Sequence, residues 1–185
     1  MSDSPRLSRL GFALIKFKID GESVYLMRED HRWNDVSLIG GHEQPRDNSN
    51  LMRAARRELL EEVPAFRSFK NFELSPLTGE VAHGPVFSAS ANAQMRYTVR
   101  FFHVGFGSNP SRILEALSER SPNVLIREQD LRAESTYRVA ELVRVLERAL
   151  EGGLTAVPFS WREDLATSLR AAGSSAWTQR QISFS

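Results

Sequence analysis

The sequence predicts an α+β fold, and three observations support that fold class. Several segments alternate apolar and polar residues as strands do, and two of them flank Asp20-Gly21, a strong two-residue turn signal. Residues 51–63 and 137–150 instead carry apolar side chains at helical spacing. A mixture of several strands and three or more helices within 185 residues is typical of a single compact domain of this class.

Composition narrows the possible functions. Hydrophobic residues make up 41% of the chain and charged residues 25%, as in ordinary globular proteins. A formal net charge of +1 gives no general attraction to nucleic acid or to membranes, so neither is an expected partner. The chain has no cysteine, which excludes disulfides, a thiolate nucleophile and a zinc-thiolate site. No apolar run suits a signal peptide or a membrane span, so a cytoplasmic location is the default expectation.

The first half of the chain is expected to form a hairpin, a third strand and a long helix. The strand segments are Phe12–Lys18, Val24–Met27 and Val36–Ile39, the last of which leads into Gly40-Gly41. After a polar loop, Asn48, Ser49 or Asn50 can cap a helix that Pro64 ends. The helix is expected to pack one face on the sheet, with its apolar residues at Leu51, Met52, Ala55, Leu59 and Val63 and another face carrying Ala54, Glu58 and Glu61.

The second half is expected to add four strands and two helices. The strands are 69–77, 81–87, 95–104 and 123–126, the last of which precedes an acidic turn. One helix starts near Asn109 and Pro110, and the other spans Tyr137–Leu150 with Ala140, Val143, Leu146 and Leu150 inward.

The C-terminal end differs in character, and we divide the chain into a domain at 1–152 and a segment at 153–185. Ser160 to Glu163 has the pattern of a capping box and predicts a short helix through Leu169. Residues 171–185 are small and polar with isolated apolar side chains. This end could dock on its own domain, join a second subunit in a homodimer, or be partly disordered.

Three glutamates on the long helix are the strongest functional signal. Glu58 lies three residues before Glu61 and four before Glu62, so all three carboxylates can reach one side of the helix. Like charges this close repel each other, so either they spread into solvent or a hard cation such as Mg²⁺ or Mn²⁺ holds them together. The nearby Gly40-Gly41 pair would let backbone approach a ligand closely.

The segment from Gly41 to Ala65 resembles a divergent form of the Nudix hydrolase signature. That signature reads Gly, five residues, Glu, seven residues, then Arg-Glu-apolar-any-Glu-Glu-any-Gly-apolar. Arg57, Glu58, Leu59, Glu61 and Glu62 match it position by position, and Gly41 suits the leading glycine. The chain departs from it in three ways: the interval from Gly41 to Arg57 is two residues longer, Ser49 stands eight residues before Arg57 with Asp47 as the nearest acid, and Pro64 replaces the closing glycine.

The resemblance implies an α/β/α sandwich with a mixed sheet and a Mg²⁺-dependent hydrolase. Its substrate would be a nucleoside diphosphate linked to another moiety, cleaved at the pyrophosphate bond. The resemblance also implies that Glu58 and Glu62 bind the metal (Mg²⁺, or Mn²⁺), with Glu61 as a direct or water-mediated ligand and the Gly41 carbonyl as a further one. Arg57 would brace these carboxylates.

The general base and the substrate contacts are harder to assign from sequence. Candidates for the base are a helix glutamate or a later acid, and Glu128 and Asp130 are the first to test, ahead of Glu80. Gly40, Gly41 and His42 could contact substrate, as could Glu43, and the arginines near the glycines could bind phosphate. These arginines are Arg28, Arg32 and Arg46, while Trp33, Tyr25, Tyr97 and Phe101 are the aromatic residues that could stack on a base.

Two other functions stay open. A Nudix-like domain with little turnover could bind nucleotides as a sensor or regulatory module, and the altered loop, Ser49 and Pro64 favour that alternative. An ordinary structural domain with a charged helix would leave the glycine pair and the acid spacing as coincidence.

Overall fold

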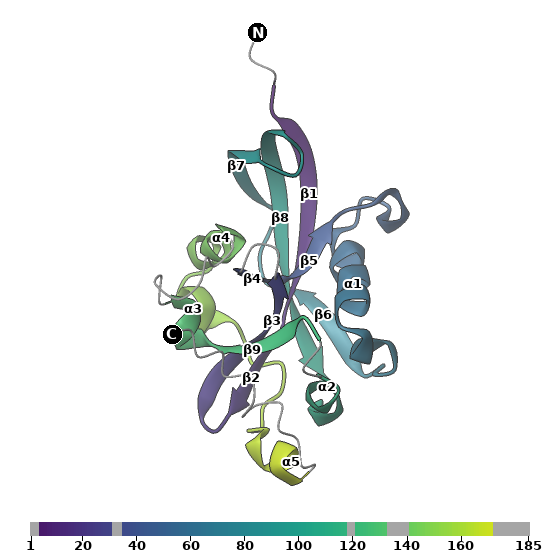
Figure 1. Cartoon of the computed structure of the whole chain (residues 1–185), viewed down its shortest axis with the longest axis vertical. Coiled ribbons are helices and arrows are strands. Elements are labelled where there is room, and N and C mark those ends of the chain that lie inside the picture. The colour runs from purple at the N-terminus through teal and green to yellow at the C-terminus, as the bar shows by residue number, and fades with distance from the viewer. Residues whose placement is uncertain (1–3, 31–34, 118–120, 133–140, 172–185) are drawn as a thin grey trace.

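A computed structural model of the chain describes residues 4–30, 35–117, 121–132 and 141–171 (Figure 1). Its strands are β1 (Arg6–Leu14), β2 (Lys16–Ile19), β3 (Glu22–Asp30), β4 (Asp35–Ser37), β5 (Ile39–His42), β6 (Phe72–Pro76), β7 (Val81–Ser88), β8 (Ala93–Phe106) and β9 (Asn123–Arg127). Its α-helices are α1 (Leu51–Glu62), α2 (Ser111–Glu115), α3 (Glu128–Arg132), α4 (Glu141–Ala149) and α5 (Ala166–Ala171). Short 3₁₀ turns lie at Pro45–Asp47, Pro64–Arg67 and Gly153–Ala156.

The strands form two sheets. One has the order β5-β1-β8-β6, with β7 also paired to β8, and the other has the order β2-β3-β4, with β9 paired to β3. β1 runs parallel to β8, whereas β5 is antiparallel to β1 and β6 is antiparallel to β8, so the first sheet is mixed as predicted. The predicted hairpin is also present: Asp20-Gly21 joins β2 and β3, and Ile19 pairs with Glu22.

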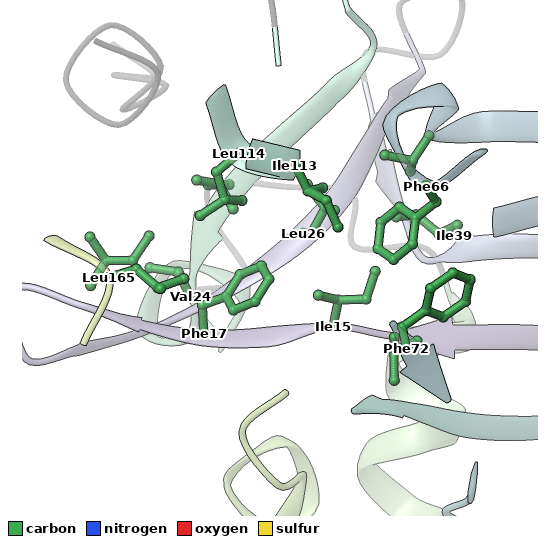
Figure 2. Close-up of a cluster of buried hydrophobic side chains, with 14 of the residues drawn as sticks. Ile15, Phe17, Val24, Leu26, Ile39, Phe66, Phe72, Ile113, Leu114 and Leu165 are labelled. Atoms are coloured by element: carbon green, nitrogen blue, oxygen red, sulfur yellow. The ribbon is translucent and has the colours of Figure 1, made fainter. Parts of the chain in front are cut away.

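Helices cover both faces of the first sheet, which confirms the predicted sandwich. Figure 1 shows α1 on one side of β1 and β8 and α4 on the other. Alternate residues of β1 divide between two hydrophobic cores: Phe12 belongs to the core that contains Val143 and Leu146 of α4, and Ala13 to the core that contains Leu59 of α1. Figure 2 shows the second core, which contains Ile15, Phe17, Phe66, Phe72 and Leu165. This period of two is what a sheet covered on both faces requires.

Helix α1 begins and ends close to its predicted bounds. Asn50 is the capping residue, since its Oδ1 accepts hydrogen bonds from the backbone N–H of Met52 and Arg53 at 3.0 and 3.2 Å. The prediction for Ala54 was wrong, because this side chain is fully buried. The helix lies so close to β1 that a Cβ on Gly11 would be 2.3 Å from the carbonyl oxygen of Leu51.

The glycine pair lies within a strand, which corrects its predicted place after one. The expected strand at Val36–Ile39 divides into β4 and β5, and Gly40 and Gly41 pair with Phe12 and Gly11 of β1. β1 itself begins at Arg6, earlier than Phe12, because backbone pairing with β8 from Arg6 onward makes a strand without an apolar alternation.

Three further predictions need correction. The acidic turn after β9 is the helix α3. β6 begins at Phe72 because the turn at Pro64–Arg67 follows α1. Ser160 does not cap a helix: it is buried, its Oγ accepts a hydrogen bond from the backbone N–H of Lys16 at 3.0 Å, and α5 begins only at Ala166.

Residues 153–171 contribute to both cores. Leu154 and Val157 belong to the core that contains α4, and Leu165 and Leu169 to the other. The division at residue 152 stays a prediction, and residues 172–185 and Ala140 lie outside the described residues. No helix in the described part of the chain has both the length and the apolar character needed to cross a membrane.

Candidate active site

Helix α1 places two glutamates against the glycines of β5. The backbone N–H of Gly40 donates to Oε2 of Glu62 at 3.0 Å. A Cβ on Gly41 would lie 2.8 Å from Oε1 of Glu58, so a side chain at this position would displace the carboxylate. The side chains of Glu58 and Glu62 are 15% and 9% exposed. These two carboxylates are therefore largely buried and lie beside the two residues of β5 that have no side chain.

β5 forms one edge of its sheet, and α1 satisfies the backbone groups on that edge. Glu62 accepts the N–H of Gly40, and Nη2 of Arg57 donates to the carbonyl of His42 at 2.8 Å. Unpaired backbone groups at an edge cost free energy when they are shielded from water. The polar side chains of α1 thus fix the helix to the edge strand at two points.

Each of the three helix glutamates contacts an arginine. Glu58 accepts from Nη1 of Arg57 at 2.6 Å, and Glu62 accepts from Nη1 of Arg28 on β3. Glu61, which is 45% exposed, accepts from Nη2 of Arg46 at 2.9 Å and lies 3.4 Å from Arg57. These positive charges offset the repulsion among the carboxylates and explain how three acids stay on one side of the helix.

A buried ion pair between Asp47 and Arg57 positions the acidic helix. Nε and Nη2 of Arg57 donate to Oδ1 and Oδ2 of Asp47 at 3.2 and 2.9 Å, the two-point geometry in which arginine binds carboxylates most strongly. The side chains of Asp47 and Arg57 are 4% and 11% exposed, respectively. The hydrogen bonds that Arg57 donates to Asp47 lower the pKa of Asp47 and raise the pKa of Arg57 further.

Burial raises the pKa of Glu62 above its ordinary value. The charge of Arg28 and the N–H of Gly40 oppose this effect, and the nearby charge of Glu58 adds to it. Glu62 is thus a buried carboxylate that lies close to another negative charge. A bound cation would compensate the charge of such a group.

A pocket of about 360 Å³ opens on the other face of β5. Gly40, Gly41 and His42 line one part of it, and Glu141 and Leu142 of α4 line another. His83 and Tyr97, from β7 and β8, also line it, and their rings lie nearly parallel with centroids 6.2 Å apart. The glycine pair therefore borders both this pocket and the α1 carboxylates.

Comparison with known proteins places this arrangement in a known fold. No protein-family model and no curated relative matches the sequence. Among solved structures, NrtR of Shewanella oneidensis in complex with a 27mer DNA has a TM-score of 0.54 at 13% identity, covering 76% of this chain and 59% of the NrtR chain. The Ap4A hydrolase of C. elegans has a TM-score of 0.51 at 16% identity, covering 76% and 93%.

The NUDIX domain of the same NrtR, solved with ADP ribose, has a TM-score of 0.49 at 13% identity, covering 80% and 87%. The chain has a Nudix fold. It spans 59% of the length of the NrtR chain that was solved with DNA.

Asp47 has the position of the first acid of the Nudix signature. It follows Gly41 after five intervening residues, as the signature requires, so the two extra residues lie between Asp47 and Arg57. The 3₁₀ turn at Pro45–Asp47 carries the aspartate to the arginine, and Asn48 and Ser49 at positive φ lead from that turn toward α1. Ser49 stands eight residues before Arg57, whereas the spacing counted forward from Gly41 reaches Asp47, the nearest acid.

The residues beside the Nudix glycines fit a divalent cation in their chemistry. Glu58 and Glu62 supply hard oxygen donors, the kind that Mg²⁺ prefers, and Glu61, which precedes Glu62 directly, is the most exposed of the three acids. As placed, their oxygens are held by arginines, and within the described residues no three acidic or histidine side chains form a ready cation site. A cation bound here would therefore replace an arginine contact, such as that of Arg28 with Glu62 or that of Arg46 with Glu61.

The structure does not bring the later acids to the Nudix helix. Glu128 lies 2.8 Å from Nζ of the buried Lys16 and accepts from Oγ1 of Thr155 at 2.9 Å. It lines a different pocket, together with Glu22 and Arg132. Asp130 lies on α3 beside it, and Glu80 pairs with Arg9 at 2.9 Å.

The predicted substrate contacts divide between the two sides of β5. Arg28 and Arg46 reach the acids, whereas His42 points its ring toward Ser8 and Tyr97, with Nδ1 2.7 Å from Oγ of Ser8. Glu43 pairs with Arg9 at 3.1 Å. Tyr25 and Phe101 are fully buried and Tyr97 alone of the described aromatic candidates lines the pocket, while Arg32 and Trp33 lie outside the described residues.

Gly41→Ala is expected to lower turnover about 100-fold while the protein remains folded. The added Cβ would collide with the carboxylate of Glu58, and displacing a reacting group by about 1 Å can cost about that factor. Gly79→Ala is the matched control, because a Cβ there meets nothing within 4 Å. Equal turnover of the two variants would show that Glu58 need not lie against Gly41.

Proposed function

We propose that the chain hydrolyses the pyrophosphate bond of a nucleoside diphosphate linked to another moiety, with Mg²⁺ or Mn²⁺ as cofactor. The observation that carries this proposal is the placement of two buried carboxylates, Glu58 and Glu62, against the bare backbone of Gly40 and Gly41. The carboxylates would bind the cation, and the glycine backbone beside them would let a phosphate group approach closely. The Nudix fold supports it, since an Ap4A hydrolase shares that fold.

In this proposal the α1 residues have distinct roles. Glu58 and Glu62 would hold the cation, and Glu61 would assist from the exposed side. A bound divalent cation offsets charge on the phosphoryl oxygens and lowers the pKa of a bound water. Arg57 keeps Glu58 in place through its pair with Asp47, and Arg28 and Arg46 would bind phosphate oxygens once the carboxylates have released them. Glu61, as the most exposed of the three, would accept the proton of the attacking water.

Turnover of a substrate panel tests the proposal. The panel contains a nucleotide sugar, a dinucleoside polyphosphate, ADP-ribose and a nucleoside triphosphate, each with Mg²⁺, with Mn²⁺ and with EDTA. We expect release of a mononucleotide from at least one linked diphosphate, loss of that activity with EDTA, and a large decrease in Glu61→Gln. Product release that persists in EDTA, or none from any substrate, would contradict the proposal.

A nucleotide-binding sensor is the second candidate, and two observations favour it. Every α1 glutamate is already paired with an arginine, and one structure that shares the fold is NrtR in complex with DNA. In the same panel a sensor would show saturable binding of a nucleotide without product. A net charge of +1 gives this chain no general attraction for DNA, so its partner in that case would be another protein or a small molecule.

A further inference from the structure

The pocket on the α4 side of β5 has the features of a binding site for an aromatic ring. Its volume of about 360 Å³ is near the small end of ligand pockets, which run from roughly 300 to 1,000 Å³. Leu10, Phe12 and Val86 give it apolar surface. Such a space suits one nucleoside rather than two.

Two rings from neighbouring strands offer a stacking surface. His83 and Tyr97 lie directly opposite each other on β7 and β8, and the angle between their rings is 16°. The imidazole of His83 is only 10% exposed, so it is held firmly in this orientation. Nearly parallel aromatic faces at the border of a pocket accept a flat base, because every base has a π-face.

One carboxylate gives the pocket its chemical preference. Glu141, at the start of α4, is the acidic one among the described residues that line the pocket, and its Oε2 lies 3.7 Å from Nε2 of His83. An ionised carboxylate only accepts hydrogen bonds. Guanine alone among the common bases presents two adjacent N–H donors, at N1 and at its 2-amino group, whereas adenine and cytosine present a donor beside an acceptor.

The pocket is connected to the proposed catalytic site through the glycine pair. Gly40 and Gly41 line the pocket, and the same residues contact Glu62 and Glu58 on the other side of the edge strand. Because neither residue has a side chain, it is the backbone of the glycine pair that lies between the pocket and these two carboxylates. A base held in the pocket would thus leave its phosphates close to the α1 carboxylates.

We infer that this pocket binds the guanine base of the substrate, with the ring against Tyr97 and His83 and its N1–H and 2-amino group donating to Glu141. The substrate class is then a guanosine diphosphate linked to another moiety. This inference rests on the proposed function for the role of the phosphates, but the base pocket can be measured without turnover.

The test is equilibrium binding of GMP, IMP and AMP to the full chain by calorimetry. IMP lacks only the 2-amino group of GMP. We expect GMP to bind about 10-fold more tightly than IMP or AMP, because a hydrogen bond to a charged group is lost in both. Glu141→Ala should bring the GMP to IMP ratio close to one, whereas Glu151→Ala, a matched change at an exposed glutamate after α4, should leave it unchanged.

A second variant tests the stacking surface. Tyr97→Leu should weaken GMP and AMP alike by about 10-fold. Equal affinity for the three nucleotides, or a GMP preference that survives Glu141→Ala, would overturn the inference. Tight GMP binding without hydrolysis would contradict only the proposed activity, and hydrolysis of linked diphosphates with no base preference would contradict only the guanine pocket.

Discussion

Glu62→Gln is expected to lose at least about 100-fold in kcat/KM and yet to be no less stable than the wild type at neutral pH. Residues that merely support a metal ligand cost 10- to 100-fold when mutated, so a ligand itself should cost no less. The amide oxygen can still accept from the N–H of Gly40, and Arg28 is half-exposed, so its lost ion pair is worth little. Activity and stability would thus separate in this variant.

The pH dependence of stability gives an independent readout for Glu62. Burial raises the pKa of Glu62 in the folded state, so the folded protein holds this proton more readily than the unfolded chain does. The stabilisation that this proton gives the folded protein is fully present below pH 4.5, the ordinary pKa of a glutamate. It is lost as the pH rises through the pKa of Glu62 in the folded state. Urea titrations of wild type and Glu62→Gln should therefore diverge in favour of the variant above that pH.

Glu115→Gln, at an exposed position on α2, is the control for both measurements. It should match wild type in kcat/KM and in the pH dependence of unfolding. A Glu62→Gln protein with near-normal turnover would remove Glu62 from the site. A variant that loses stability relative to wild type as pH rises would show that the ion pair outweighs the burial cost.

Asp47→Asn is expected to destabilise the protein by about 2 kcal/mol, because it removes a charge-assisted double hydrogen bond from a buried arginine. For a chain of this length that loss lowers Tm by about 4–8 °C. The pKa of Asp47 is lowered in the folded state, so its contribution is complete above the unfolded pKa and is lost as pH falls through the folded pKa. The difference between wild type and variant should accordingly be full at pH 7 and shrink in acid.

The same variant should lower turnover about 10-fold, since Arg57 loses the partner that orients it toward Glu58. Asp130→Asn, at a partly exposed site on α3, is the matched control for thermal melting and for kinetics. An unchanged Tm in Asp47→Asn would mean that Glu58 and the carbonyl of His42 are sufficient to hold Arg57.

Local patterns in the sequence predicted the parts of the fold that local chemistry decides. Asp20-Gly21 fixed the β2–β3 hairpin, and Asn50 and the apolar spacing fixed α1. The early start of β1 could not be read in this way, because Arg6 to Arg9 become strand only through pairing with β8, nearly 90 residues later in the chain. Ser160 likewise begins a capping-box pattern, but its hydroxyl instead accepts a hydrogen bond from the backbone N–H of Lys16.

Apart from the glycine pair, the candidate site was predictable where its residues share one helix. The spacing of Glu58, Glu61 and Glu62 is a property of α1 itself, whereas Arg28 comes from β3 and no sequence pattern links it to Glu62. Glu128 is a candidate from its place in the acidic turn before the helix at 137–150, but its partner is Lys16, a buried lysine that also donates to the carbonyl of Leu154, and only tertiary packing brings these residues together. The pocket between α4 and the sheet, which Tyr97 and Glu141 line, likewise forms only through tertiary packing.

Binding of Mn²⁺ to the full chain, followed by the loss of its free-ion EPR signal, tests the central claim most directly. We expect saturable binding in wild type and in Glu115→Gln, and its loss in a chain with both Glu58→Gln and Glu62→Gln. Arg28→Ala should bind the ion at least as tightly as wild type, because the carboxylate of Glu62 would no longer be held by that arginine. Equal binding by wild type and the double variant, or none by either, would contradict a cation site between α1 and the glycines of β5.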